Sequence, residues 1–171
     1  MVHVREMDGA DIEAVSTIRV RGWQAAYAGM VPQTYLDAMT VEGDAVQRRQ
    51  LFSQPLRKSR DLVAHADRGL AGWICFGPCR GEMPVLGRAG EIYALYVSPD
   101  LIGQGIGRRL LGEAHTQMKS QGFEASALWV LSGNQRARRF YERAGYQADG
   151  ATQDDVYDEI TLTELRYLRV L

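Results

Sequence analysis

Apolar positions in the first third of the chain predict one strand followed by helices. Residues 2–7 alternate between apolar and polar side chains, as in a half-buried strand. Apolar residues then recur with a helical period from Ile12 to Tyr27, and Gly29 is placed to end that helix. Two shorter helical patterns follow, at residues 32–39 and 41–52.

The rest of the chain predicts a sheet with two further helices. Apolar runs at 61–65 and 70–76 surround an Asp-x-Gly turn, which predicts a hairpin. Residues 77–90 contain two prolines and four glycines and predict an irregular loop. Continuous apolar runs at 92–97 and 127–131 indicate strands that are covered on both faces. The remaining predicted elements are two helices, 106–118 and 134–144, and a long strand with a bulge, 157–171.

This order of elements predicts one mixed α/β domain that spans residues 1–171. We expect a partly parallel sheet of six or seven strands flanked by helices. Apolar residues make up 46% of the chain and charged residues 24%, which is typical of a globular protein.

The charge balance and the hydropathy exclude several classes of protein. A formal net charge of -1 gives no general attraction to nucleic acid or to an anionic membrane. No segment approaches the ~18 consecutive apolar residues of a transmembrane helix. The first residues lack an apolar signal region, so we expect a cytoplasmic protein.

Cysteines and histidines do not form a metal-binding pattern. Cys75 and Cys79 have neither redox-pair nor zinc-site spacing, and His3, His65 and His115 are far apart in the sequence. We therefore expect two reduced thiols and no metal.

A glycine-rich turn lies between the apolar strand 92–97 and the helix that follows it. Gly103, Gly105 and Gly107 let the backbone approach a ligand closely, and the free amides of a helix N-terminus favour an anion such as a pyrophosphate. The spacing matches neither the Walker A pattern nor the dinucleotide fingerprint. Taken alone, the turn is equally well explained by steric requirements.

The central part of the chain resembles the GNAT superfamily of N-acetyltransferases. Three segments carry the resemblance together: the strand EIYALYV at 91–97, the turn that matches the family pattern Arg/Gln-x-x-Gly-x-Gly/Ala, and the run NQRARRFYERAGY at 134–146. Residues 23–35 resemble one branch of the family. Ile102 departs from the pattern, which has Arg or Gln there. It removes a side-chain contact and leaves the turn amides, which make most pyrophosphate contacts in the family.

The resemblance implies acetyl-CoA as co-substrate, bound between the strands 92–97 and 127–131. Main-chain groups of the first strand are expected to bind the pantetheine arm, and turn amides the pyrophosphate. Asn134 is expected near the pantetheine or the amine, although its position equally fits a helix N-cap. The implied cofactor-binding residues are Leu95, Tyr96, Val97, Gly103, Gln104, Gly105, Ile106, Gly107, Arg108 and Asn134.

The resemblance also implies two catalytic residues. An alkylamine with a pKa of about 10 is protonated at neutral pH, so a base must take its proton before it attacks a thioester. Glu91 matches the base in part of the family, or is a solvated glutamate at a strand end. Other members carry the base at the position of Trp129, which cannot accept a proton. Tyr141 matches the general acid for the departing thiolate, or is a core aromatic.

The amine acceptor is less well defined by the sequence. Trp23, Tyr27 and Tyr35 are expected to line its pocket, although core packing explains them equally well. Acidic residues before the last strand either attract a cationic amine or belong to a solvated loop; they are Asp154, Asp155, Asp158 and Glu159.

We therefore predict an N-acyltransferase that moves an acetyl group from acetyl-CoA to a primary amine of a small molecule or peptide. The amine attacks directly in a ternary complex, so neither cysteine takes part in turnover. The alternative is a non-catalytic acyl-CoA-binding sensor of the same fold, which the presence of both Glu91 and Tyr141 disfavours. A homodimer is expected by analogy alone.

Overall fold

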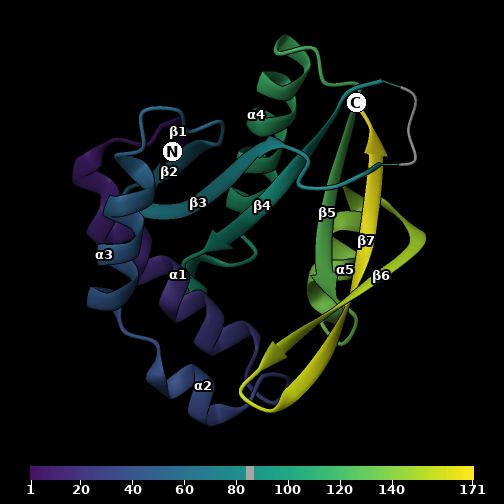
Figure 1. Ribbon diagram of the computed structural model, residues 1–171. Coiled ribbons are helices and arrows are strands. Elements are labelled where there is room, and N and C mark those ends of the chain that lie inside the picture. The colour runs from purple at the N-terminus through teal and green to yellow at the C-terminus, as the bar shows by residue number, and fades with distance from the viewer. Residues whose placement is uncertain (84–86) are drawn as a thin grey trace.

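A computed structural model describes residues 1–83 and 87–171, which form a curved sheet with helices on both faces (Figure 1). The strands are β1 (His3–Glu6), β2 (Arg60–Ala66), β3 (Gly69–Pro78), β4 (Ala89–Val97), β5 (Ala125–Leu131), β6 (Gln147–Tyr157) and β7 (Ile160–Val170). The helices are α1 (Ile12–Ala26), α2 (Gln33–Ala38), α3 (Val41–Phe52), α4 (Ile106–Ser120) and α5 (Gln135–Arg143), with 3-10 turns at Gly9–Asp11 and Pro99–Leu101.

The sheet has seven strands in the order β1-β2-β3-β4-β5-β7-β6, which confirms the predicted mixed sheet. Among the described strands, β4 and β5 form the only parallel pair. They pair only at their first residues, Ala89–Ile92 with Ala125–Leu128. Beyond that point they diverge, as Figure 1 shows, and the sheet opens between them.

The two faces of the sheet are covered by different helices. Leu62 and Ile74 of the central strands are buried in a cluster with side chains of α4 and α5. Their neighbours Val63 and Trp73 are buried on the opposite face with residues of α1 and α3. This alternation is the period-two pattern of a strand that is covered on both sides.

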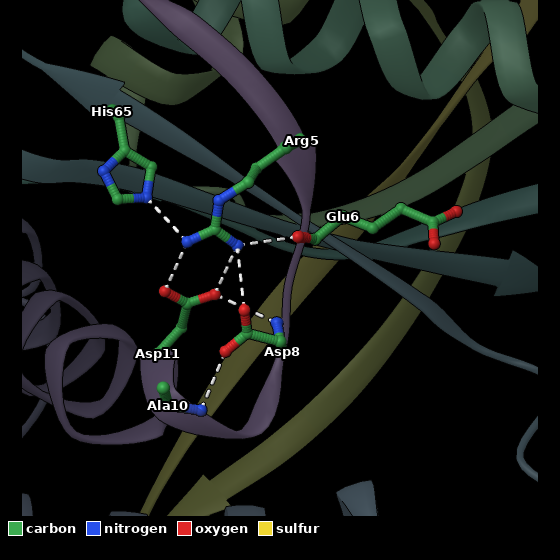
Figure 2. A network of polar contacts seen from close by, with 6 residues as sticks. All are labelled: Arg5, Glu6, Asp8, Ala10, Asp11 and His65. Atoms are coloured by element: carbon green, nitrogen blue, oxygen red, sulfur yellow. Dashed lines mark hydrogen bonds and ion pairs between the residues drawn. The ribbon is translucent and has the colours of Figure 1, made fainter.

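A polar network ties β1 to the start of α1 (Figure 2). The guanidinium of Arg5 donates to both carboxylate oxygens of Asp11, at 2.7 and 2.8 Å. Asp8 and Asp11 form a capping box, in which the Asp8 amide donates to Asp11 and the Ala10 amide donates to Asp8. The hydrogen bonds from Arg5 lower the pKa of Asp11, so the carboxylate stays charged and the pair holds the helix entry in place.

The end of the chain differs from the predicted single strand over 157–171. It forms a hairpin of β6 and β7, which turns at Asp158 with a φ of 53°. The prediction missed β6 because this edge strand is exposed on both faces and its sequence, QADGATQDDVY, has no apolar alternation. The register shift lies in β6, between Ala148 and Thr152, and not in β7.

The predicted loop over 77–90 is shorter than expected. Gly77 and Pro78 belong to β3, and Ala89 and Gly90 belong to β4. The part at 84–86 lies outside the described residues.

Candidate active site

A cavity of about 1110 Å³ lies where β4 and β5 diverge. It is lined by β4, the start of α4, the end of β5, α5 and the end of α1. Small-molecule sites typically enclose about 300–1,000 Å³, so this one has room for a large, extended ligand.

The glycine turn forms one wall of the cavity. Gly103 and Gly105 have φ angles of 91° and 80°, which glycine adopts without steric cost. Gly105 is the N-cap of α4, and without a side chain it cannot cap the first amides of the helix. The amides of Ile106, Gly107 and Arg108 thus start a helix that lines the cavity, where the positive end of the helix dipole favours an anion.

The end of β4 forms a second wall. On one side β4 pairs with β3, with Tyr96 opposite Trp73. On the other side its pairing with β5 ends at Ile92. In the described strands, main-chain groups of Leu95, Tyr96 and Val97 that point toward β5 therefore have no strand partner, and a ligand in the cavity can use them.

Two predicted residues reach the cavity from α5. Asn134 is its N-cap, because the side-chain oxygen accepts from the Ala137 amide at 3.1 Å, and it also lines the cavity. Tyr141 lines the cavity and packs against Phe140 and Tyr146. Burial raises the pKa of Tyr141 far above its ordinary value, so the phenol stays protonated at neutral pH.

The three predicted acceptor residues take different positions. Tyr27 lines the cavity, and its hydroxyl lies 3.4 Å from that of Tyr96. Trp23 and Tyr35 are not among the described residues that line the cavity. They pack with Tyr157 in an aromatic cluster beside it, at centroid distances of 5.8 and 5.2 Å.

Glu91 lies one residue before the cavity wall, which begins at Ile92. Its side chain is only 4% exposed and is ion-paired with Arg80. The Arg80 amide donates to one carboxylate oxygen at 3.0 Å, and its guanidinium donates to the other at 3.1 and 2.5 Å. Glu91 is therefore an ion-paired carboxylate beside the cavity and not the solvated strand-end residue that the sequence left open.

Comparison with known proteins identifies the family. The model of the acetyltransferase (GNAT) family matches residues 23–146. The chain belongs to the GNAT family. It is therefore an N-acetyltransferase, as the sequence predicted.

Two relatives and a solved structure illustrate the likeness. An N-acetyltransferase of Bacillus subtilis is 31% identical over 78% of this chain and 74% of its own length. Spermidine N(1)-acetyltransferase of Thermoplasma acidophilum is 24% identical over 90% of this chain and 93% of its own length. The fold is also similar to the crystal structure of the PaiA N-acetyltransferase from Thermoplasma acidophilum in complex with coenzyme A, with a TM-score of 0.79. The sequence identity is 22%, and the match covers 100% of this chain and 99% of that chain.

The site of this GNAT protein also contains residues to which the sequence assigned no role in the site. Arg143 of α5 and Met30 after α1 line the cavity, as does Glu164 of β7. Among the described lining residues, Glu164 is the only carboxylate, and the cations are on α4 and α5. No local pattern marks Glu164, because its place depends on the pairing of β7 with β5.

No group of three or more metal-ligating side chains lies together in the described residues. None of the described helices is both long and apolar enough to cross a membrane. Both cysteines are free thiols.

Proposed function

We propose that this cavity binds acetyl-CoA and that the protein transfers the acetyl group to a primary amine of a small molecule or peptide. One observation carries the proposal. All ten residues that the family resemblance assigned to the cofactor line the same cavity, although they come from β4, the turn, α4 and α5.

The chain's residues fit an acyl-CoA. The uncapped amides at the start of α4 and the side chain of Arg108 suit the pyrophosphate, and the unpaired main-chain groups at the end of β4 suit the amide-rich pantetheine arm. Ile102, which is 40% exposed, lines the cavity without adding a charge. Acetyl-CoA supplies an activated thioester.

The protein then has two proton transfers to perform. The acceptor must lose a proton, and we assign this to Glu91, acting through water because its carboxylate lies just behind the cavity wall. The departing thiolate must gain a proton, and we assign this to Tyr141, whose phenol is protonated and lines the cavity.

Direct attack by the amine fits the state of the cysteines. Burial, followed by the charge of Glu91, raises the pKa of the Cys79 thiol to about 11. Burial also raises the pKa of Cys75. A thiol that stays protonated at neutral pH is a poor nucleophile, which disfavours an acyl-enzyme at either position. The spermidine N(1)-acetyltransferase relative supports an amine as acceptor.

The test combines binding with turnover. A thermal-shift titration with acetyl-CoA should stabilise the protein, by about 2.7 kcal/mol at a hundredfold excess over the dissociation constant. Thiol release against a panel of amines should identify an acceptor. Glu91→Gln should then lower kcat at least about 100-fold while keeping the thermal shift, and Glu42→Gln on the exposed face of α3 should match the wild type.

Two results would contradict the proposal. Binding of acetyl-CoA without thiol release for any amine would favour the non-catalytic sensor. Absence of a thermal shift in folded protein would contradict the assignment of the cofactor.

A further inference from the structure

The cavity has a marked charge asymmetry. The lining residues Arg108, Arg136 and Arg143 place positive charge on α4 and α5. The opposite wall contains Glu164, the only carboxylate among the lining residues that the structure describes. An anionic cofactor bound near the arginines leaves the part of the cavity near Glu164 for a positively charged ligand.

Glu164 is held in place but its charge is not compensated. The side-chain amide of Gln153 on β6 donates to one oxygen of Glu164 at 2.6 Å. None of the ion pairs among the described residues includes Glu164. One carboxylate oxygen is thus available to a ligand, in contrast to Glu91, which Arg80 already neutralises.

Glu164 faces the acceptor side of the cavity. Leu162, two residues earlier, belongs to the same hydrophobic cluster as Trp23 and Tyr27, and residues two apart on a strand point to the same face. The negative charge of Glu164 also contributes, after burial, to the raised pKa of Tyr27. The two side chains therefore face the same space.

The strand order sets how far Glu164 lies from the reaction. Glu164 is opposite Leu131 of β5, so β5 separates it from β4. At about 4.8 Å per strand, β7 is on the order of 10 Å from β4, and farther where β4 and β5 diverge. A carboxylate there is too distant to contact an amine that attacks at β4, but it can reach another group of the same acceptor.

We propose that Glu164 binds a second ammonium group of the acceptor, so that the substrates are amines with another positive charge several bonds from the reacting nitrogen. This inference rests on the proposed acetyl transfer. The hairpin of β6 and β7 that carries Glu164 also carries Asp154, Asp155, Asp158 and Glu159, none of which is among the described residues that line the cavity.

The experiment compares butanediamine with butylamine, which has the same carbon chain and a single amine. Calorimetric titrations with and without coenzyme A measure binding, and thiol release from acetyl-CoA measures turnover. Wild-type protein should bind the diamine more tightly and acetylate it with a higher kcat/KM. Glu164→Gln should weaken diamine binding roughly tenfold and lower the diamine-to-monoamine ratio of kcat/KM by a similar factor.

Glu159→Gln is the matched control, because it removes the same charge from the same hairpin outside the cavity lining. It should keep the wild-type ratio, and thermal melts should show that both variants fold. The inference is overturned if Glu164→Gln keeps the wild-type preference, if it weakens both amines equally, or if wild-type protein does not prefer the diamine. Diamine binding that depends on Glu164 without turnover of any amine would support the inference and contradict acetyl transfer.

Discussion

At the scale of single residues, the two carboxylates near the cavity differ in what surrounds them. Glu91 is buried and receives three hydrogen bonds from Arg80. Glu164 is half-buried and receives one from a neutral amide, that of Gln153. A carboxylate that no protein cation neutralises suits binding of a cationic ligand.

Tyr141→Phe tests the proton donor. Burial, followed by the effects of Tyr27 and Tyr146, raises the pKa of the Tyr141 phenol far above its ordinary value, so it stays protonated throughout the working pH range. A thiol leaves fairly well without help, so we expect kcat to fall only about 10- to 100-fold. Stopped-time thiol-release assays measure this, with acetyl-CoA binding retained in the thermal shift.

Tyr146→Phe provides the control for Tyr141. The Tyr146 hydroxyl is buried in contact with Ser126 and His115, both at 2.7 Å, and is not among the described cavity-lining residues. This variant should lower the melting temperature without lowering kcat. An equal loss of kcat in both variants would show that Tyr141 acts through packing.

At the scale of elements, the cavity depends on how closely α4 packs on the sheet. Gly72 of β3 lies beneath the first turns of α4. A Cβ there would come within 2.9 Å of Leu110 and 3.1 Å of Ile106, and within 3.2 Å of the Tyr96 carbonyl oxygen. The missing side chain therefore sets the position of the helix N-terminus relative to β4, and both are walls of the cavity.

Gly72→Ala tests this contact. Overpacking should lower the free energy of unfolding by about 1–3 kcal/mol and displace the start of α4, which weakens acetyl-CoA binding. Urea denaturation and the acetyl-CoA thermal shift measure the two effects. Gly112→Ala in the same helix meets nothing within 4 Å, so it should instead stabilise the protein by about 0.5–1 kcal/mol. If Gly112→Ala destabilised the protein as much as Gly72→Ala, the assignment of the Gly72→Ala loss to overpacking against α4 would be contradicted.

At the scale of the whole molecule, a buried polar chain joins α4 to the strands β5 and β7. His115 Nε2 lies 2.7 Å from the Tyr146 hydroxyl, which lies 2.7 Å from the Ser126 hydroxyl. Arg169 of β7 lies 3.3 Å from His115 Nδ1. A guanidinium can only donate, so Nδ1 accepts and the proton of the neutral imidazole is on Nε2.

This arrangement predicts how the stability of the fold depends on pH. Burial, then the charges of Arg169 and Lys119, lowers the pKa of His115 from 6.5 to about 4. At pH values between these two pKa values, the unfolded chain binds a proton that the folded protein does not. The free energy of unfolding therefore falls as the pH falls. The total loss is up to about 3 kcal/mol.

Urea midpoints measured from pH 7 to pH 4 test this prediction. His115→Gln should be less stable at pH 7, because it disturbs the contact with Tyr146, and should lose less stability on acidification. His3→Asn, at an exposed position in β1, should keep the wild-type pH dependence. A pH dependence unchanged by His115→Gln would contradict the assignment.

Much of the architecture and part of the cavity lining could be read from the chain. The helices, the hairpin of β2 and β3 and the strands β4 and β5 follow from local periodicity and turn residues, which act over a few neighbouring positions. The turn at 103–107 was recognisable because only glycine adopts its backbone angles without cost. Its place between a strand and a helix then located the end of the cavity that we propose binds an anion.

Other features depend on contacts between segments that are distant in the sequence. The edge strand β6 forms by pairing with β7 and has no apolar pattern of its own. The Arg80 ion pair of Glu91, and the packing of Trp23 and Tyr35 beside the cavity, arise only when separate elements meet. Glu164 enters the cavity because β7 pairs with β5 where β4 has already diverged. Local patterns specify elements, but tertiary packing decides which side chains share a cavity.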